Sequence, residues 1–288
     1  MKKLDKDTKI LIVGLGVIGG GYAKALSALG YSVKCITKER RDIDYALKLG
    51  IITEGDTEVS PALLDWADII VFALYPKTFI DWIREYGHLL RPHTLVTDVS
   101  GVKSGVVRTV QELLPEGVEF ISAHPMAGRE KSGVEYSDAE VFRGANYIVV
   151  PTERNTEGAI EICKNLGFTL GFGRITCLTV KEHDEMIAFL SQLTHCIAVT
   201  LMTANDSPEL EKYTGDSFRD LTRIAKINDL MWSELFLLNR DALLAEMDSF
   251  MYKLSKFRKM IADGDREAIR AEMRTATAKR ELFDKPKN

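Results

Sequence analysis

The sequence predicts an α/β protein with an N-terminal Rossmann-type domain, built on a doubly wound, mostly parallel sheet, and a C-terminal all-α domain. Three observations predict this fold. Short β-branched runs alternate with helical patterns over the first 175 residues, a glycine-rich turn follows the first run, and strand-like runs stop after Cys177. Apolar strands separated by helices indicate a parallel sheet covered on both faces. We therefore expect domains of residues 1–177 and 178–288.

The elements of the first domain are predicted from short apolar runs and from amphipathic stretches. The expected strands are Lys9–Val13, Ser32–Thr37, Asp68–Ala73, Thr94–Asp98, Val118–Ser122, Asn146–Val150 and Phe168–Phe172. The expected helices are Ile18–Leu29, Ile43–Leu49, Thr78–Tyr86, Ser104–Leu114 and Glu157–Leu166. In the second domain, Thr179 with Glu182 three residues later has the pattern of a capping box, which begins a helix. A long amphipathic segment follows at Met231–Met260.

Composition narrows the class of protein. The 288 residues are 45% hydrophobic and 28% charged, as in a soluble globular protein. A net charge of −4 gives no electrostatic reason to expect nucleic acid or an anionic membrane. The longest apolar run, Ile69–Leu74, is too short to span a membrane, and no signal peptide is evident. The four cysteines form no CxxC pair, so we expect no metal site and a cytoplasmic protein with reduced thiols.

The glycine-rich turn predicts a dinucleotide site. Gly14, Gly16 and Gly19 form a GxGxxG motif between the first strand and a helix that begins with Val17 and Ile18. In this fingerprint the first glycine makes the tight turn, the second lets the backbone approach the pyrophosphate, and the third packs helix on strand. The helix N-terminus then faces the phosphates. The alternative is a glycine-rich turn without a ligand.

The end of the second strand indicates which dinucleotide binds. An NAD site normally has an acidic residue there to hold the ribose 2′-hydroxyl. This chain has Thr37, followed by Lys38, Arg40 and Arg41. A hydroxyl and cationic groups suit a 2′-phosphate, so we expect NADP in preference to NAD. The alternatives are a solvated cationic turn, or Glu39 as the ribose ligand.

A histidine follows the fifth expected strand, in the pentapeptide His124-Pro125-Met126-Ala127-Gly128. Ligands of doubly wound sheets bind at the carboxyl ends of strands, where Asp98, Ser100 and Lys103 also lie. Histidine is suited to general acid–base work near neutral pH. We therefore expect His124 to be catalytic, the alternative being a hydrogen-bonded structural histidine. His183, in the first turn of a helix, is expected to be structural.

A second cluster lies in the helical domain, at Phe218–Ala225 with Trp232. Asp220 and Arg223 are three residues apart and share a face if the segment is helical. They form either a surface ion pair or an arginine fork for a substrate carboxylate.

Together these stretches resemble the prephenate dehydrogenase family of tyrosine biosynthesis. The matching segments are Gly14–Gly19, Thr97–Lys103, His124–Gly133, Ser191–His195 and Phe218–Ala225 with Trp232. The resemblance implies oxidative decarboxylation of prephenate to 4-hydroxyphenylpyruvate, with hydride transfer to the nicotinamide. It also implies a homodimer that forms through the helical domain.

The resemblance carries roles to particular residues. His124 matches the histidine that accepts the hydrogen bond from the ring hydroxyl, and Arg223 matches the arginine that holds the ring carboxylate. His195 and Glu130 match other active-site residues. Asp220 and Trp232 match positions that support the arginine and line the site.

The chain departs from the family at one position. The family often has a serine, near the catalytic histidine, where this chain has Gly101, and Ser100 stands one position earlier. We expect Ser100 to take the catalytic role of that serine, the alternative being that it does not reach His124. We see no small amino-acid-binding domain after the helices and expect no feedback inhibition by tyrosine.

Three alternatives to prephenate dehydrogenase remain. An arogenate dehydrogenase would perform the same chemistry on a substrate that bears an ammonium group, which Glu130 could favour. A β-hydroxyacid dehydrogenase shares the domain arrangement but uses a helical lysine motif that does not stand out here. A non-catalytic dinucleotide-binding sensor would bind the cofactor without turning over a substrate.

Overall fold

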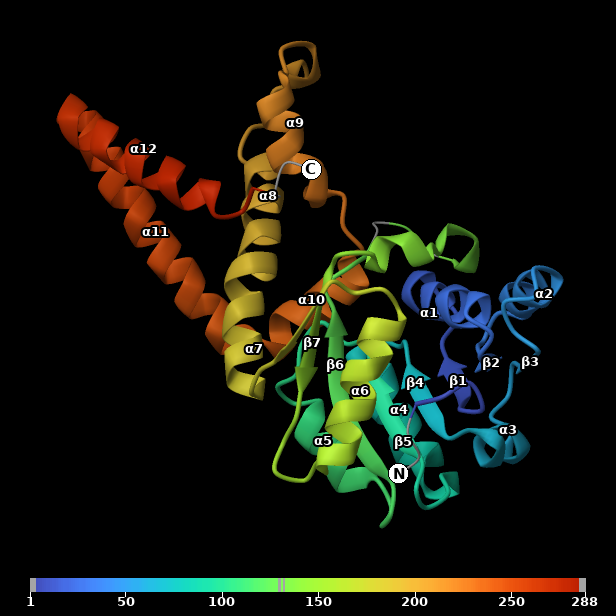
Figure 1. Cartoon of the computed structure of the whole chain (residues 1–288). Coiled ribbons are helices and arrows are strands. Elements are labelled where there is room, and N and C mark those ends of the chain that lie inside the picture. Colours follow the sequence, from blue (N-terminus) through green and yellow to red (C-terminus); the bar gives the residue numbers. More distant parts are fainter. Residues whose placement is uncertain (1–3, 129–130, 132, 285–288) are drawn as a thin grey trace. The chain divides into compact units, whose positions relative to one another are not determined.

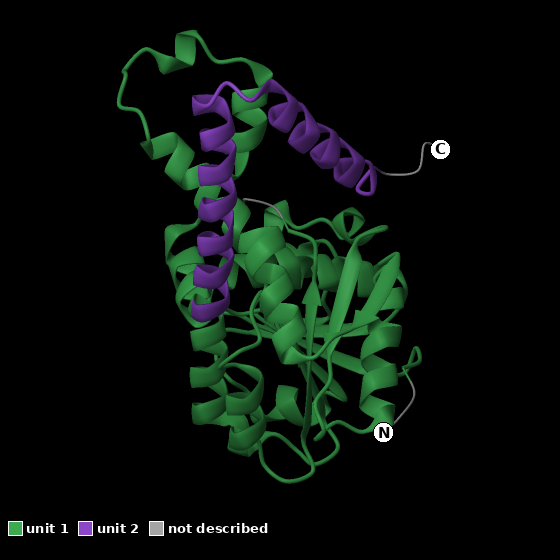
Figure 2. Ribbon diagram, turned by 90° about the vertical axis from the view of Figure 1, so that its left-hand side faces the viewer, with its two compact units in different colours: residues 1–240 green, residues 241–288 purple. Residues whose placement is uncertain are grey.

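The structure is a computed structural model that describes residues 4–128, 131 and 133–284. It divides into two compact units, residues 1–240 and residues 241–288, which Figure 2 colours separately. This division groups the first helices after the sheet with the sheet itself. The expected domain boundary at residues 177/178 stays a prediction, because compactness does not test it.

One eight-stranded sheet forms the centre of the first unit, with the order β3-β2-β1-β4-β5-β6-β7-β8 (Figure 1). Neighbouring strands are parallel except β6 and β7, which are antiparallel. The predicted doubly wound, mostly parallel sheet is therefore confirmed. The strands are β1 (Lys9–Val13), β2 (Ser32–Ile36), β3 (Glu54–Asp56), β4 (Ile69–Phe72), β5 (Leu95–Asp98), β6 (Glu119–Pro125), β7 (Asn146–Val150) and β8 (Arg174–Cys177).

Helices cover both faces of the sheet, because successive side chains of each strand point to opposite sides. On β1, Ile10 and Ile12 pack into one apolar cluster with α1, α2 and α6, whereas Leu11 and Val13 pack into another with α3, α4 and α5. These helices are α1 (Val17–Ala28), α2 (Arg40–Lys48), α3 (Pro61–Trp66), α4 (Pro76–Tyr86), α5 (Val107–Leu113) and α6 (Glu157–Thr169).

The sequence prediction was wrong at the end of the sheet. Phe168–Phe172, expected as a strand, instead completes α6 and the turn after it, and the edge strand is β8. Leu170 and Phe172 are buried, but they lie just after the end of α6 and not in a strand. Gly171 between them turns the chain, with φ +94°. The strand β3 and the helix α3 were not expected, because β3 is only three residues long and polar.

A nearly continuous helical run follows the sheet. It consists of α7 (Val180–Ile187), a π-helical segment (Ala188–Leu193) and α8 (Thr194–Thr203). The predicted capping box is confirmed: Thr179 Oγ1 accepts from the Glu182 amide at 3.2 Å, and the Thr179 amide donates to Glu182 Oε2 at 2.8 Å. Among the described residues, the segment 180–203 is long and apolar enough to cross a membrane, by length and composition only.

The helical pattern expected over Met231–Met260 is interrupted. The helix α10 (Asp229–Leu238) ends at Asn239, and α11 (Arg240–Ala262) begins at the next residue. The Asn239 side chain is buried and donates to the Asp184 carbonyl at 2.9 Å and to Gln192 Oε1 at 2.7 Å. These two contacts hold the end of α10 to the run that contains α7 and α8.

The remaining elements are short, except in the second unit. The first unit also contains α9 (Asp216–Thr222) and the 3-10 turns Gly87–Leu89, Val134–Tyr136, Ala139–Phe142, Leu210–Lys212 and Arg223–Ala225. The second unit contains most of α11 and all of α12 (Arg266–Glu281). A turn at Gly264, with φ +67°, joins these two helices.

Candidate active site

The turn between β1 and α1 has the shape that a dinucleotide requires. Gly14 has φ +93°, and a Cβ there would lie 2.6 Å from the Ala73 carbonyl oxygen. A Cβ on Gly19 would lie 2.0 Å from the Gly14 carbonyl oxygen, whereas one on Gly16 would meet nothing within 4 Å. Two glycines therefore close the turn, and the third leaves open space at the N-terminus of α1, where Val17 and Ile18 form the first turn. A pyrophosphate fits this space.

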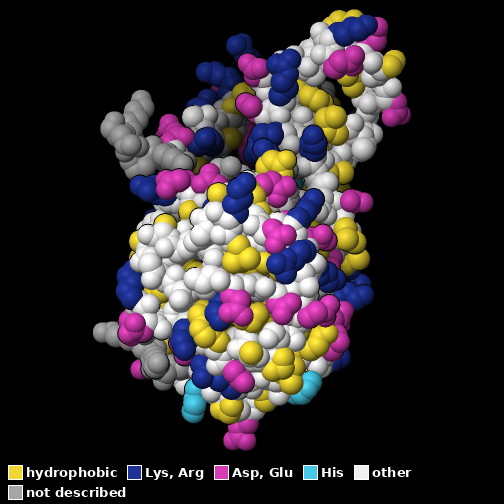
Figure 3. Space-filling view, turned by 90° about the vertical axis from the view of Figure 1, so that its right-hand side faces the viewer, with side chains coloured by type: hydrophobic (Ala, Val, Ile, Leu, Met, Phe, Trp, Pro, Cys, Tyr) yellow, Lys and Arg dark blue, Asp and Glu magenta, His cyan; other side chains and the backbone are white. Residues whose placement is uncertain are grey.

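The end of β2 carries the predicted cationic cluster. Thr37 Oγ1 accepts from the Leu15 amide at 3.3 Å, so this hydroxyl already lies against the glycine turn. Lys38, Arg40 and Arg41 are exposed. Arg40 Nε lies 2.9 Å from Asp44 Oδ1 and Arg41 Nε lies 3.6 Å from Asp42 Oδ1, so each guanidinium has an acidic neighbour on α2. Basic and acidic side chains are likewise intermingled on the face shown in Figure 3.

His124 lies at the end of β6, in register with Ile148 of β7. It was expected just after this strand, and the strand instead extends through Pro125. Its Nδ1 lies 2.9 Å from Nε2 of His183, and Nδ1 of His183 lies 2.7 Å from Asp184 Oδ1. The second imidazole is completely buried. Burial, with His183 and Lys103 nearby, lowers the pKa of His124 well below 6.5.

Asp184 is held by backbone donors as well as by His183. Its Oδ1 accepts from the Lys103 amide at 2.9 Å and its Oδ2 accepts from the Ser104 amide at 2.6 Å. Burial acts to raise the pKa of Asp184, but the hydrogen bonds from His183 and Ser104 outweigh it and the pKa is lowered. Asp184 is therefore a carboxylate that receives three donors.

A buried ion pair contacts the backbone of Ala123, the residue immediately before His124. Lys103 Nζ lies 3.2 Å from Asp98 Oδ2 and donates to the Ala123 carbonyl at 2.7 Å. Asp98 Oδ1 also accepts from Ser122 Oγ at 2.6 Å and from the Ala123 amide at 3.0 Å. Burial lowers the pKa of Lys103, and Asp98 opposes that shift. This cluster ties the end of β5 to β6 immediately before His124.

The structure places Gly101, and not the Ser100 hydroxyl, against His124. A Cβ built on Gly101 would lie 3.9 Å from His124 Nε2. Ser100 is buried, its amide donates to Asp98 Oδ2 at 3.1 Å, and its hydroxyl makes no hydrogen bond with any described residue. The catalytic role expected for Ser100 stays a prediction without a contact to support it.

His195 and Trp232 form a stacked pair. Their ring centroids are 3.7 Å apart with an interplanar angle of 30°, and His195 Nδ1 donates to the Ser191 carbonyl at 2.8 Å. Leu235, one turn after Trp232 on α10, would lie 3.6 Å from a Cβ on Gly101. This contact places α10, which carries Trp232, beside Gly101.

Two further predicted residues, Asp220 and Arg223, belong to the region after α8. Asp220 lies in α9, and Arg223 lies in the 3-10 turn that follows and packs against α8. The helix ends at Thr222, so the two residues do not share one α-helix as expected. Glu130 lies outside the described residues.

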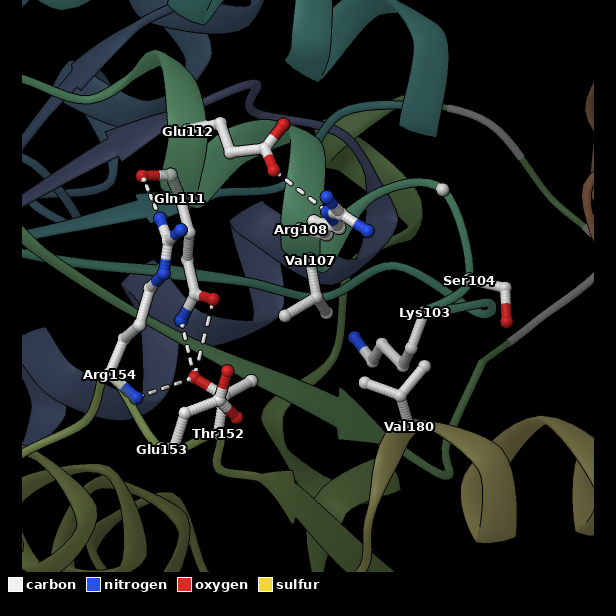
Figure 4. Close-up of a pocket in the computed structure, with 11 residues that line it drawn as sticks. Lys103, Ser104, Val107, Arg108, Gln111, Glu112, Thr152, Glu153, Arg154 and Val180 are labelled. Atoms are coloured by element: carbon white, nitrogen blue, oxygen red, sulfur yellow. Dashed lines mark hydrogen bonds and ion pairs between the residues drawn. The ribbon is translucent and has the colours of Figure 1, made fainter.

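A separate hollow of about 320 Å³ lies between the start of α5 and the segment after β7 (Figure 4). Arg108, Gln111 and Arg154 line it, and Arg108 Nε is paired with Glu112 at 2.7 Å. None of the predicted site residues lines this hollow. Lys103 and Ser104, whose amides donate to Asp184, also line it.

Sequence reasoning missed the part that His183 and Asp184 play beside His124. His183 was expected to be a structural residue, whereas it lies in direct contact with the candidate catalytic imidazole. Two titratable residues side by side in the first turns of the helix after the sheet were the available signal. No local pattern indicates which other histidine they face.

A dinucleotide turn and a hydrogen-bonded histidine at the ends of parallel strands of one sheet define a Rossmann-type dehydrogenase. The family model described as the nucleotide-binding domain of prephenate dehydrogenase matches residues 22–172, and that of its dimerization domain matches residues 179–275. The chain belongs to the prephenate dehydrogenase family.

Individual relatives agree with this membership. The chain is 31% identical to the prephenate dehydrogenase of Bacillus subtilis over 281 residues, which cover 94% of this chain and 74% of the relative. It is 30% identical to the cyclohexadienyl dehydrogenase of Zymomonas mobilis, covering 89% and 90%. A crystal structure of A. aeolicus prephenate dehydrogenase with hydroxyphenyl propionate and NAD+ superposes with a TM-score of 0.89, at 30% identity and covering 98% and 100%.

Proposed function

We propose that the protein oxidises and decarboxylates prephenate to 4-hydroxyphenylpyruvate in tyrosine biosynthesis, with a nicotinamide dinucleotide as hydride acceptor. The observation that carries this proposal is His124, which lies at the end of β6 in a chain of this family whose glycine turn fits a dinucleotide. Family membership disfavours the β-hydroxyacid dehydrogenase alternative. A non-catalytic sensor would have no use for a histidine held by a buried hydrogen-bonded partner.

The chemistry assigns His124 to the ring hydroxyl. The nicotinamide, when bound, takes the hydride from the ring carbon that carries this hydroxyl. His124 accepts the hydroxyl hydrogen bond and then the proton, as the C–O bond becomes a carbonyl. Its lowered pKa keeps it neutral near pH 7, which an acceptor requires.

Loss of the ring carboxylate completes the reaction. The C–C bond to that carboxylate breaks and carbon dioxide leaves. The bonding electrons pass through the ring, which becomes aromatic, to the carbonyl oxygen, and this oxygen takes back the proton from His124 to become the product hydroxyl. Arg223 is assigned to hold the carboxylate in place, since a guanidinium forms two parallel hydrogen bonds with such a group. We assign Asp220 to support this arginine.

The stacked pair His195 and Trp232 is assigned to the wall of the substrate site. His195 is fixed in orientation by the Ser191 carbonyl at 2.8 Å and by the Trp232 ring. A flat aromatic surface with a polar edge suits a ring substrate with a polar substituent. Glu130, which the resemblance places in the site, stays a prediction.

For the cofactor we propose NADP in preference to NAD. The support is the hydroxyl of Thr37 where a carboxylate would repel a 2′-phosphate, with exposed Lys38, Arg40 and Arg41 beside it. The hydrogen bond from Arg40 to Asp44 uses Nε, so the terminal nitrogens of this guanidinium can reach a phosphate. The competing assignment uses Glu39 as a ribose ligand for NAD.

The second candidate activity is arogenate dehydrogenation. It is favoured by the likeness to a cyclohexadienyl dehydrogenase, whose name covers more than one substrate of this ring class. The discriminating experiment is a steady-state assay of the purified protein with prephenate and with arogenate, each with NADP+ and with NAD+. The proposal requires the largest kcat/KM for prephenate with NADP+. A larger value for arogenate would move the assignment to the second candidate.

We further propose that the protein is a homodimer that associates through its helical domain. Apolar side chains on α11 are exposed, among them Met251 at 54%, Tyr252 at 59% and Leu254 at 55%. Such a surface favours a two-fold contact with a second copy. Light scattering at micromolar concentration should give about twice the 32.3 kDa of one chain. A mass near that of one chain would reject the dimer. The expected cytoplasmic location stays a prediction.

A further inference from the structure

We propose that His183 and Asp184 are positioning residues that fix the tautomer of His124, leaving its Nε2 as a hydrogen-bond acceptor for the substrate hydroxyl. The proposal rests on the proposed function for its consequence in catalysis, but the tautomer itself is a property of the protein alone. Three hydrogen-bonding groups form the series: the Asp184 carboxylate, the His183 imidazole and the His124 imidazole.

The first step of the argument starts from Asp184. Its two oxygens accept from the amides of Lys103 and Ser104, at 2.9 Å and 2.6 Å, so they act as acceptors. His183 Nδ1, 2.7 Å from Oδ1 of the same carboxylate, must therefore carry a proton and donate it. The Asp184 carboxylate thus fixes the proton of His183 on Nδ1.

In the second step, the proton position on His183 determines the proton position on His124. A neutral imidazole protonated on Nδ1 has an unprotonated Nε2, so His183 Nε2 is an acceptor. His124 Nδ1, 2.9 Å away, must then donate to it. A neutral His124 with its proton on Nδ1 has a lone pair on Nε2, on the side where Gly101 lies.

The alternative arrangement requires a charged His183. It would carry protons on both nitrogens, and His124 Nδ1 would accept. His124 would then be protonated on Nε2, where it could only donate. His183 is completely buried, and burial lowers its pKa in spite of the opposing hydrogen bond to Asp184. The neutral series is therefore the stable one near neutral pH.

The same series helps when His124 takes a proton. The imidazolium then donates from Nδ1 to His183 as a charge-assisted hydrogen bond, which is stronger than a neutral one. The negative charge of Asp184 lies at the far end of the series and favours the positive charge. An aspartate behind a catalytic histidine has the same two effects, on tautomer and on charge, in serine hydrolases. Here a second imidazole stands between the two groups.

The experiment reads the tautomer directly. The chain has only five histidines, so the ring nitrogens can be followed by ¹H–¹⁵N long-range correlation in the intact ¹⁵N-histidine-labelled protein, with and without NADP+. The variants are His183→Leu, which removes the acceptor, and His183→Gln, whose amide keeps both an acceptor and a donor. His88→Leu applies the first substitution to an exposed histidine and is the matched control.

The proposal predicts that His124 in the wild-type protein is protonated on Nδ1 and unprotonated on Nε2. In His183→Leu, we expect His124 to lose this tautomer and kcat to fall by at least about tenfold, within the range that acid–base groups supply. KM should change by less than about threefold, because the binding residues are intact. His183→Gln should recover most of kcat, and His88→Leu should match the wild type.

Two results would overturn the proposal. One is a wild-type His124 protonated on Nε2, which needs no variant and does not depend on any substrate. The other is a His183→Leu protein with kcat within about twofold of the wild type. An inactive wild-type protein with the predicted tautomer would reject the proposed function and retain this assignment of the protons.

Discussion

The Nδ1 atom of His124 and the Nε2 atom of His183 lie 2.9 Å apart, across the junction between β6 and α7. One hydrogen bond therefore ties the end of the sheet to the first turn of the helical run. Because the contact uses Nδ1, the Nε2 atom of His124 is the one left to meet a substrate at the carboxyl edge of the sheet.

Replacing His124 should remove the proton acceptor and little else. His124→Asn should lower kcat by about 10²–10⁴-fold, the range of general acid–base catalysis. Cofactor affinity, measured by fluorescence titration, should stay within about twofold, because the glycine turn is on other strands. The control is His93→Asn, an exposed residue whose φ of +72° asparagine also adopts. A His124→Asn protein with wild-type kcat would remove His124 from the mechanism.

Arg223 should act on binding more than on turnover. Loss of a charge-assisted contact of about 2–3 kcal/mol should raise the KM for prephenate roughly 30–150-fold in Arg223→Ala. Arg223→Lys should not restore it, since lysine lacks the planar fork. The exposed Arg84→Ala on α4, which loses an ion pair with Asp81, serves as the control. A KM within about twofold of the wild type would make Arg223 a structural residue.

Gly101 should tolerate the serine that is common in the family. A Cβ there would lie at ordinary contact distances, 3.6 Å from Leu235 and 3.9 Å from His124 Nε2. Gly101→Ser should therefore fold, with a melting temperature at or slightly above that of the wild type because the unfolded chain loses freedom. Gly101→Ile would fill the space in front of Nε2 and should abolish turnover. Calorimetry and kcat together check this, and a Gly101→Ser protein that does not fold would contradict the packing described.

The pH dependence should report the half-buried His124 and the buried His183. Burial lowers the pKa of both His124 and His183 below 6.5, with Lys103 and Asp184 as the neighbouring charged groups. After unfolding, each pKa returns to about 6.5, so the unfolded chain binds more protons below that pH. Their contribution to stability is complete above pH 6.5 and is lost as the pH falls.

Two measurements check this sign. The free energy of unfolding, from denaturant titration, should fall between about pH 7.5 and 5.5 by up to about 1.4 kcal/mol per histidine and pH unit below 6.5. The decrease should be smaller in His183→Gln. The kcat/KM for prephenate should remain level down to about pH 6.5 and decline only below it. A decline that begins well above pH 6.5 would show that His124 has no lowered pKa.

The preference between NADP+ and NAD+ should depend on how the protein contacts the 2′ position of the cofactor ribose. Charge-assisted hydrogen bonds of roughly 1.5–3 kcal/mol predict a kcat/KM about tenfold to hundredfold higher with NADP+ than with NAD+. Thr37→Asp should reverse the preference, because a carboxylate repels the phosphate and binds the ribose hydroxyl. Lys48→Ala, which removes a cation at the other end of α2, should have no effect. Equal or higher values with NAD+ in the wild type would reject the NADP preference. Glu39→Ala would then test whether Glu39 binds the ribose of NAD.

Sequence patterns predicted the sheet because strong local signals coincide with it. The apolar runs at Lys9–Val13 and Asn146–Val150 match β1 and β7, and the glycine turn lies where expected. The polar strand β3 and the strand β8 were missed, since pairing with a neighbour, and not composition, makes them strands.

The site was predictable only in part, for a related reason. His124 is marked by its own sequence context. His183 and Asp184 act through contacts with residues about 60 to 80 positions away, which no local pattern encodes. Likewise, the family pattern identifies Gly101 as a departure, but only the structure shows that this position lies beside His124 Nε2.

The most direct test of the central claim is the stoichiometry of the reaction with prephenate. Purified protein is incubated with prephenate and NADP+, and the reduced cofactor, carbon dioxide and 4-hydroxyphenylpyruvate are each quantified, beside a His124→Asn sample. We predict equal molar amounts of the three products in the wild type, formed far more slowly by the variant. Absence of cofactor reduction, or reduction without carbon dioxide release, would contradict the assignment.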